Sequence, residues 1–507
     1  MYQDKKIWIG QSNEGAVCIC PGMANRHGMI AGATGTGKTV TLKVLAESFS
    51  ACGVPVFLAD AKGDLAGMCC PGEESEGLTK RMEAMGMDKD TFEFTSFPTT
   101  FWDVYGQEGL PLRTTISEMG PLLLSQILGL NAIQSDILTI VFKIADDEGL
   151  LLIDTKDLRS MLQYVGENAP EYAMEYGNMS KQSLAAIIRA VVALEAEGAD
   201  QFFGEPALNI ADWMATDCDG RGKIQVLDCQ KLIQNPTMYA TFLLWMLSEL
   251  FEMLPEAGDR EKPKLVFFFD EAHMLFETAT KPVLEKIEQV VKLIRSKGVG
   301  IYFITQNPKD IPDGVLSQLG NKIQHALHAY TPAEQKGAKA AAMSFRENPA
   351  FDTYETLQEL GIGEALISVL DENGVPTVVQ RCKILPPQSQ MGAIDETIRG
   401  DEIKNDLLYT RYMEMVDRDS AYEFLMRKSR EDAEAALRMK EENEAEALRQ
   451  KQAKNAVKGV AKTAAGTIGR EIGNGVGKTI GGSFGKRLGG NIGASLGRGL
   501  LDTLFKR

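Results

Sequence analysis

The sequence predicts an α/β fold in which a mainly parallel sheet carries a large helical insertion, followed by a charged helical arm and a glycine-patterned basic tail. Short apolar runs end in polar residues at several places, which is typical of parallel strands covered by helices on both faces. A glycine-rich loop lies between one such run and a helix-compatible segment. The 507 residues, 44% of them hydrophobic, are enough for a sizeable core with appendages.

The strands of the predicted sheet are placed by their apolar runs. Two short strands are expected at 6–9 and 16–20, before a third at 29–31. A helix over 38–50 and a strand over 54–59 follow, and this order of elements opens a parallel α/β sheet. After a long helical stretch the sheet resumes in four runs, at 224–227, 265–269, 301–305 and 323–327.

These patterns divide the chain into five segments. Residues 1–64 contain the N-terminal strands and the first part of the core, 65–222 a mainly helical insertion, and 223–390 the remainder of the core. Residues 391–455 are rich in Glu, Arg, Lys and Ala and predict an exposed, charged helical arm. Residues 456–507 form the glycine-patterned tail.

The net charge of −16 is the sum of two unlike parts. Residues 451–507 carry eleven Lys and Arg and two acids, a net charge of +9. Residues 1–450 carry 43 basic and 68 acidic residues, a net charge of −25. Attraction to a polyanion must therefore come from local loops or from the tail.

Cysteine usage and hydropathy indicate the compartment. The eight cysteines and four histidines show neither a disulfide framework nor the spacing of a zinc site. The longest apolar runs, about 13 residues, are too short for a membrane-spanning helix. Because no secretory signal is visible at the N-terminus, we expect a cytoplasmic protein.

Residues 32–39, Gly-Ala-Thr-Gly-Thr-Gly-Lys-Thr, match the phosphate-binding pattern GxxxxGK[ST] in full. Glycines let successive backbone N–H groups turn around the β-phosphate of a nucleotide, Lys38 reaches the β and γ oxygens, and the Thr39 hydroxyl binds Mg²⁺. The amino end of the following helix adds its positive dipole end. The predicted nucleotide contacts are Gly32, Thr34, Gly35, Thr36, Gly37, Lys38, Thr39 and Val40.

An acidic pair follows the apolar strand predicted at 265–269. We expect Asp270 to hold the Mg²⁺ together with Thr39, through water. Glu271 stands where a carboxylate can orient and deprotonate the attacking water.

Two further positions complete the predicted catalytic set of Glu271, Lys38, Gln306 and Arg295. Gln306 follows the strand at 301–305 and is expected to sense the γ-phosphate. Arg295 precedes that strand and could act as a finger on the nucleotide of a neighbouring subunit, with Arg346 as the alternative.

The runs GATGTGKT, VPVFLADAKGDL, LVFFFDEAHMLF and IYFITQNPKDIP resemble the HerA and FtsK superfamily of P-loop ATPases, and in particular the bacterial HerA-like family of the YjgR type. The stretches FFGEPAL and ATFLLWMLSELFEMLP extend the resemblance over about residues 1–430. It implies an ASCE-type, RecA-like P-loop NTPase fold, ATP and Mg²⁺ as ligands, a hexameric ring, and DNA threaded through the central channel. Only 31 residues precede Gly32, too few for the N-terminal barrel through which archaeal HerA docks its nuclease, so no nuclease partner is implied.

The tail keeps a strict four-residue register. Glycines recur at every fourth position from Gly469 to Gly497, and large apolar residues do so from Ile468 to Leu500. As a helix, such a segment would pack closely on a partner helix or a membrane. Its Lys and Arg would attract anionic lipid or DNA phosphate, and a solvated, unordered tail is the alternative.

The leading hypothesis is an ATP-hydrolysing HerA-like ring motor, a homo-hexameric DNA translocase or helicase. The alternative is a membrane-associated assembly or secretion-type ATPase whose glycine-zipper tail anchors it peripherally at the membrane. A third hypothesis, a nucleotide-switched scaffold with negligible turnover, is disfavoured by Glu271, since a pure switch needs no positioned base.

Overall fold

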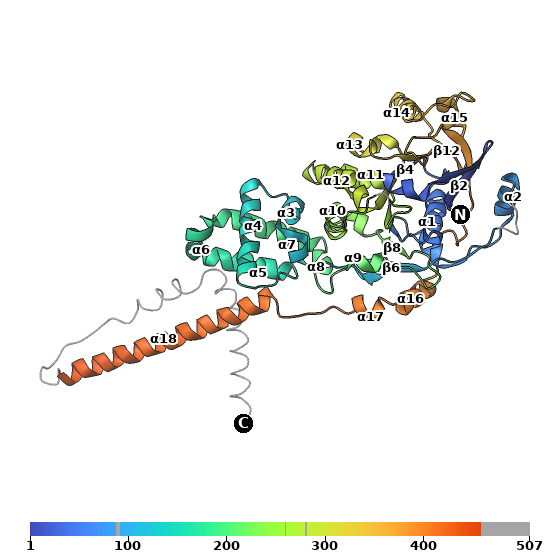
Figure 1. Ribbon diagram of the computed structural model, residues 1–507. Coiled ribbons are helices and arrows are strands. Elements are labelled where there is room, and N and C mark those ends of the chain that lie inside the picture. The colour runs from blue at the N-terminus through green and yellow to red at the C-terminus, as the bar shows by residue number, and fades with distance from the viewer. Residues whose placement is uncertain (88–91, 259, 279–280, 458–507) are drawn as a thin grey trace. The chain divides into compact units, whose positions relative to one another are not determined.

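The described residues of the computed structural model form two compact units (Figure 1). Unit 1 comprises the described residues within 1–114 and 194–416, and unit 2 those within 115–193 and 417–457. No described helix combines the length and the apolar character needed to cross a bilayer. The structure describes residues 1–87, 92–258, 260–278 and 281–457.

Unit 1 is built on one 13-stranded sheet, in the order β1-β2-β13-β12-β11-β4-β10-β9-β5-β8-β6-β7, with β3 paired to β2. From β11 to β7 all neighbouring strands are parallel, whereas the other pairs are antiparallel. The strands are β1 (Tyr2–Gln3), β2 (Lys6–Ser12), β3 (Gly15–Ile19), β4 (Gly28–Ala31), β5 (Val56–Asp60), β6 (Thr99–Asp103), β7 (Leu110–Pro111), β8 (Ile224–Asp228), β9 (Leu265–Phe269), β10 (Val299–Thr305), β11 (Asn321–His325), β12 (Glu364–Ser368) and β13 (Gln380–Ile384).

All eight strands expected from the sequence are present, with ends shifted by no more than a few residues. The expected helix after the glycine-rich loop is α1 (Lys38–Ala51). The structure adds the short β1, the strands β6 and β7, which lie within the segment 65–222, and the antiparallel pair β12 and β13.

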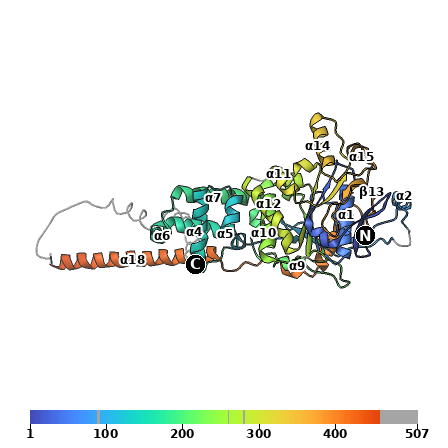
Figure 2. The same ribbon diagram turned by 45° about the horizontal axis from the view of Figure 1, so that its top comes forward.

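The helices of unit 1 cover both faces of the sheet, with α1 on one face and α10 and α12 on the other (Figures 1 and 2). Besides α1, they are η1 (Pro21–Arg26), η2 (Ala66–Cys69), α2 (Glu76–Ala84), α8 (Ala199–Phe202), α9 (Ile210–Trp213), η4 (Leu232–Gln234), α10 (Pro236–Met253), α11 (Ala272–Thr278), α12 (Lys281–Ile294), η5 (Arg295–Lys297), η6 (Pro308–Asp310), α13 (Asp313–Leu316), α14 (Pro332–Met343), α15 (Thr353–Glu359), α16 (Glu396–Asn405) and α17 (Tyr409–Tyr412).

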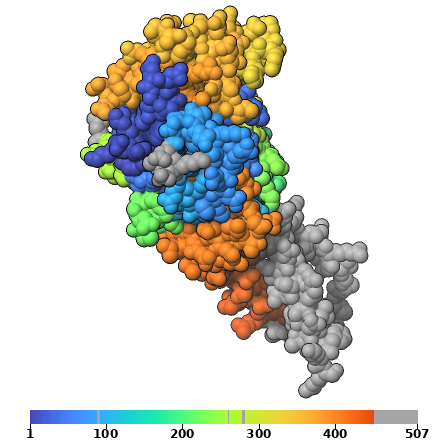
Figure 3. Space-filling model, turned by 90° about the vertical axis from the view of Figure 1, so that its right-hand side faces the viewer, coloured from blue at the N-terminus to red at the C-terminus, as the bar shows by residue number. Residues whose placement is uncertain are grey.

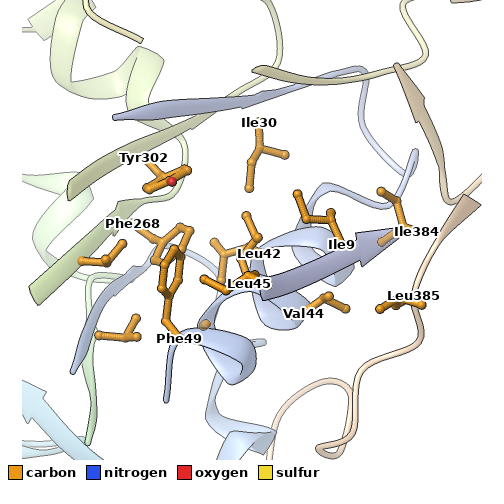
Figure 4. Close-up of a cluster of buried hydrophobic side chains, with 14 of the residues drawn as sticks. Ile9, Ile30, Leu42, Val44, Leu45, Phe49, Phe268, Tyr302, Ile384 and Leu385 are labelled. Carbon is orange, nitrogen blue, oxygen red and sulfur yellow. The ribbon is translucent and has the colours of Figure 1, made fainter. Parts of the chain in front are cut away.

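The face under α1 is filled by alternate residues of the central strands, because successive side chains of a strand point to opposite faces. Ile30, Phe268 and Tyr302 pack there with Leu45 and Phe49 of α1 (Figure 4). The ring centroid of Phe49 lies 6.2 Å from that of Phe268 and 6.0 Å from that of Tyr302. This packing anchors the helix that begins at the phosphate loop.

The opposite face is rich in aromatic side chains. The ring of Phe57 in β5 lies 4.7 Å from that of Trp213 in α9 and 5.0 Å from that of Phe267 in β9. The ring centroid of Phe303 in β10 lies 5.3 Å from that of Phe276 in α11. Strands covered on both faces need apolar residues at successive positions, which explains the continuous apolar runs in the sequence.

Unit 2 is helical in its described part. Thr115, Asn131 and Asp154 cap α3, α4 and α5 with reciprocal capping boxes. The hydroxyl of Ser420 donates to Asp157 of α5 at 2.5 Å, and Lys428 of α18 donates to the Tyr164 hydroxyl at 2.6 Å. The helices are α3 (Ile116–Ile127), α4 (Ala132–Asp147), α5 (Thr155–Glu167), α6 (Ala169–Tyr176), most of α7 (Lys181–Ala196), and α18 (Ala421–Val457).

The segment predicted as a charged arm, 391–455, contains α16 and α17 in unit 1 and most of α18 in unit 2. The glycine-patterned tail lies, from residue 458 on, outside the described residues.

Candidate functional site

The predicted site residues follow neighbouring strands of the sheet. Because β4, β10 and β9 are parallel and adjacent in that order, their carboxyl ends meet at one edge. Lys38 follows β4, Gln306 follows β10, and Asp270 and Glu271 follow β9. The structure therefore brings these four residues to the same edge, where ligands of open α/β sheets bind.

The phosphate loop, residues 32–39, needs its glycines for two reasons. Gly32, Gly35 and Gly37 have φ angles of +155°, +80° and +106°, which side chains on L residues rarely allow. A Cβ on Gly32 would also lie 2.5 Å from the Cβ of His325. The loop is thus shaped by backbone conformation and by close packing on β11.

Lys38 is held by the loop that precedes it. Its Nζ donates to the carbonyl oxygens of Gly32 at 2.7 Å and Ala33 at 3.0 Å, and the side chain is buried. Burial lowers the pKa of Lys38, although the charge of Glu271 opposes this effect. An ammonium held only by neutral carbonyls in a buried place is ready to bind an anionic phosphate.

Glu271 is bound through both carboxylate oxygens. Its Oε1 lies 2.6 Å from the Nζ of Lys62, and its Oε2 lies 3.2 Å from Nδ1 of His273 and 3.5 Å from Nε2 of Gln306. Burial tends to raise the pKa of Glu271, but the hydrogen bond and charge of Lys62 outweigh it, so the pKa is lowered. Glu271 therefore stands as an oriented carboxylate between the ends of β5 and β10.

Asp270 is 4% exposed, and burial raises its pKa to about 7, against the opposing charge of Lys62. The charge of Lys62 does not offset the burial of this carboxyl, and a divalent cation would supply further positive charge. With the hydroxyl of Thr39, a partly exposed residue, it offers the oxygen donors that Mg²⁺ prefers. These two residues fit a magnesium site.

Sequence reasoning missed the role of Lys62. The carboxylate of Asp60 accepts hydrogen bonds from the backbone N–H groups of Lys62, Gly63 and Leu65 at 3.1, 2.7 and 3.0 Å. These bonds hold the loop after β5 so that Lys62 faces Glu271. The run Asp-Ala-Lys-Gly-Asp after an apolar strand was the available signal, since its strand neighbours β9.

The two candidate finger arginines lie elsewhere in unit 1. Arg295 is exposed and directly precedes β10, so it lies at the amino end of a strand whose carboxyl end meets the site. That strand spans roughly 20 Å at about 3.3 Å per residue. Arg346 is also exposed and donates to the carbonyl oxygen of Pro376 at 3.2 Å. Within one chain, Arg295 is not brought together with Lys38 and Glu271.

A family model described as "Helicase HerA-like C-terminal" matches residues 5–507. The chain belongs to this family. The match confirms the resemblance seen in the four sequence motifs and covers both units.

Curated relatives match this HerA-like chain over shorter stretches. A probable helicase of Methanocaldococcus jannaschii is 32% identical over 155 residues, which are 29% of this chain and 28% of the relative. The DNA double-strand break repair helicase HerA of Sulfolobus acidocaldarius is 26% identical over 162 residues, 31% of each protein. The chain thus matches less than a third of the length of these relatives.

Solved structures share the fold at low sequence identity. The unbound bacterial conjugative coupling protein TrwB superposes with a TM-score of 0.50 and 14% identity, covering 78% of this HerA-like chain and 91% of TrwB. TrwB in complex with a non-hydrolysable GTP analogue gives a TM-score of 0.51 and 13% identity, covering 78% and 92%. With β10 inserted between the phosphate-loop strand β4 and the acidic strand β9, the fold is that of an ASCE-type P-loop ATPase.

Proposed function

We propose that this chain binds ATP with Mg²⁺ at the phosphate loop and hydrolyses the bond to the γ-phosphate. The observation that carries the proposal is the place of Glu271, one strand away from the Gln306 strand and two from the phosphate loop, with its carboxylate paired to Lys62 and hydrogen-bonded to Gln306. A general base must be positioned before its basicity matters. This arrangement serves hydrolysis and has no use in a passive nucleotide switch.

Each residue of the site has a task in the proposed reaction. Lys38 exchanges its two carbonyl partners for the β- and γ-phosphate oxygens, while the loop N–H groups cradle the β-phosphate. Thr39 and Asp270 would hold the Mg²⁺, which neutralises phosphate charge when bound. Glu271 orients a water molecule and takes its proton, and Gln306 links the base to the γ-phosphate.

Replacing Glu271 by Gln tests this proposal. The amide keeps the shape of the side chain but accepts no proton, so turnover should fall by about 100-fold or more while nucleotide binding persists. Glu277→Gln, an exposed change on α11, is the matched control and should hydrolyse ATP at the wild-type rate. Equal turnover in the Glu271→Gln and wild-type proteins would contradict the assignment of the base.

We further propose a homo-oligomeric ring, a hexamer, in which Arg295 reaches the nucleotide of the neighbouring subunit. Its exposure and its distance from the phosphate loop of its own chain support a role between subunits. Subunits with Arg295→Ala and subunits with Lys38→Ala should each be inactive, and mixing them should restore part of the activity. If Arg346→Ala subunits, and not Arg295→Ala subunits, restore activity when mixed with Lys38→Ala subunits, Arg346 is the finger.

DNA is the proposed substrate of the ring. The names of two matched relatives, a probable helicase and a DNA double-strand break repair helicase, support it. The test is the ATPase rate with and without single- and double-stranded DNA at low salt, using Glu271→Gln as the blank. Stimulation is expected to weaken with added salt because phosphate contacts release counterions. If neither form of DNA stimulates the ATPase, the proposal that DNA is the substrate is wrong.

The tail supports a second candidate, a membrane-associated assembly or secretion-type ATPase. Its four-residue glycine register and net positive charge suit close helix packing and anionic lipid. Sedimentation with anionic vesicles, with neutral vesicles as the control, distinguishes it. Binding that is lost when residues 458–507 are deleted would favour this candidate over a DNA motor without an anchor.

A further inference from the structure

Lys62 enters the site from the strand on the far side of the acidic pair. β5 lies next to β9, so the edge of the sheet presents the phosphate loop, Gln306, Glu271 and Lys62 in spatial order. The Nζ of Lys62 lies 2.6 Å from Oε1 of Glu271. The Lys62 side chain is 44% exposed, whereas that of Glu271 is 9% exposed. One partner is therefore fixed and the other is free to move.

The two carboxylate oxygens of Glu271 have different partners. Oε2 accepts a hydrogen bond from Gln306 and lies near His273, whereas Oε1 is bound by Lys62. A water molecule that gives its proton to Glu271 needs an oxygen with a free lone pair. Departure of Lys62 would open Oε1 and leave the orienting contacts on Oε2 unchanged.

The backbone around Lys62 is held, so the movement belongs to the side chain. Asp60 accepts three backbone hydrogen bonds from this loop. Gly63 has a φ of +76°, and a Cβ there would lie 2.5 Å from Nε2 of Gln230. The loop presents the ammonium from a fixed base, and a lysine stem reaches several ångströms by rotating its own bonds.

A bound γ-phosphate would compete with Glu271 for the ammonium. Lys38, the residue expected to contact that phosphate, feels the charges of both Glu271 and Lys62. The γ-phosphate of ATP carries more negative charge than one carboxylate, and ADP lacks it. The ammonium of Lys62 thus has a stronger partner nearby only when ATP is bound.

We propose that Lys62 is a γ-phosphate-binding catalytic residue that pairs with Glu271 in the nucleotide-free site and transfers to the γ-phosphate when ATP binds. The transfer frees Oε1 of Glu271 for the attacking water and adds a cation to the phosphoryl group. No covalent bond changes in this step, since one ion pair replaces another. The inference rests on the proposed ATP site, but its test does not require turnover.

The test measures affinities for ADP and for the slowly hydrolysed analogue ATPγS, both with Mg²⁺, by titration calorimetry. Lys62→Met should weaken ATPγS binding by about tenfold and change ADP binding by less than about twofold. Lys62→Arg keeps the charge and should retain most of the preference for ATPγS. Lys143→Met, which removes an exposed lysine of unit 2, is the control.

Removing the competing carboxylate gives an opposite expectation. In Glu271→Gln the ammonium of Lys62 has lost its ion pair, so ATPγS should bind several-fold more tightly relative to ADP. That gain should vanish in the Lys62→Met/Glu271→Gln double variant, because the two residues share one interaction. Melting temperatures of all variants establish that each is folded.

Each outcome has a distinct meaning. Equal weakening of ADP and ATPγS by Lys62→Met would overturn the inference, as would faster ATP turnover with unchanged affinities, which would make Lys62 a restraint on Glu271 alone. If the wild type binds both nucleotides and the variants follow the expected pattern but ATP is not hydrolysed, the proposed hydrolysis fails, whereas the transfer of Lys62 to the γ-phosphate stands. Failure of the wild type to bind either nucleotide would overturn both.

Discussion

The backbone N–H of Gly363 donates a hydrogen bond to the carbonyl oxygen of Thr36, 2.9 Å away, and so ties the turn before β12 to the phosphate loop. A Cβ on Gly37 would lie 3.2 Å from the Cα of Gly363, so the two loops touch through their backbones. Nη2 of Arg81 donates to the carbonyl oxygens of Gly363 and Ile384 at 2.6 and 2.7 Å. In the space-filling view the N-terminal strands and the region of α2 lie side by side (Figure 3).

We expect Arg81→Met to weaken nucleotide binding although Arg81 lies outside the phosphate loop. Loss of the guanidinium removes its hydrogen bonds to both carbonyl oxygens, of which that of Gly363 keeps only the N–H of Ile384, and loosens the turn against Thr36. ADP affinity measured by calorimetry should fall by about three- to tenfold. Lys80→Met, at an exposed neighbour on α2, should bind ADP like the wild type, and equal affinities in both variants would contradict the supporting role.

Two buried charged residues of α1, Lys43 and Glu47, hold the segment that follows β13. Glu47 and Lys43 are 2% and 1% exposed. The carboxylate of Glu47 accepts from the N–H of Gln388 at 2.8 Å and from the N–H of Ser389 at 3.1 Å. Lys43 donates to the carbonyl oxygen of Gln390. Both charged groups are therefore hydrogen-bonded to one segment, and each feels the opposite charge of the other.

Replacing one of these two residues should destabilise unit 1 far more than replacing both. Glu47→Ala leaves the buried ammonium of Lys43 uncompensated. The free energy of unfolding of unit 1 should therefore fall by about 3–5 kcal/mol. The double variant Lys43→Met/Glu47→Leu should recover a large part of that loss. All four tryptophans, Trp8, Trp102, Trp213 and Trp245, lie in unit 1, so urea unfolding followed by their fluorescence reports on this unit. Additive losses in the double variant would contradict the coupling.

The central strands could be predicted because burial on both faces leaves an unbroken apolar signature, as in β9, Leu265–Phe269. β6, Thr99–Asp103, is equally buried but contains two threonines and an aspartate, and so lacks that signature. Its Trp102 satisfies Nε1 by donating to Oε1 of Gln225 in β8, at 2.7 Å. Such a strand is stabilised by partners distant in the sequence, which no local pattern reveals.

The site, too, has one part that could be predicted from the sequence and one part that could not. Lys38, Asp270, Glu271 and Gln306 could be placed because each follows a recognisable strand, and strand order brings them together. The contact between Lys62 and Glu271 could not, because it depends on side-chain positions across neighbouring strands.

The buried His27 should make the stability of the fold depend on pH. Its Nδ1 accepts the N–H of Ile301 at 3.0 Å, and its Nε2 donates to the carbonyl oxygen of Val291 at 2.9 Å. Burial lowers the pKa of His27 to about 4, with the nearby Arg295 and Arg26 adding to the effect. The folded state thus keeps His27 neutral, while the unfolded chain binds a proton below about pH 6.5. Stability from this group is present above pH 6.5 and is lost as the pH falls toward 4.

We therefore expect the cost of His27→Gln to shrink as the pH is lowered. Between pH 7 and pH 5 the difference in unfolding free energy between wild type and variant should decrease by about 2 kcal/mol. Comparing the two proteins at each pH cancels the contributions of other titrating groups. Urea unfolding followed by tryptophan fluorescence measures the difference, and a pH-independent difference would show that folding does not change the pKa of His27.

Glu271 has a φ of +47°, in the left-handed region that residues with a side chain seldom occupy. That conformation costs about 1 kcal/mol or more, which the contacts of the carboxylate help to offset. In Glu271→Gly the strain disappears, whereas in Glu271→Ala it remains after the contacts are lost. The free energy of unfolding, measured with urea, should therefore be about 1 kcal/mol higher for the glycine variant than for the alanine variant. This is the reverse of their order within a helix. Both variants should be inactive in ATP hydrolysis, so the higher stability of the glycine variant should bring no turnover. An alanine variant as stable as the glycine variant would mean that the backbone at this position relaxes when the carboxylate is removed.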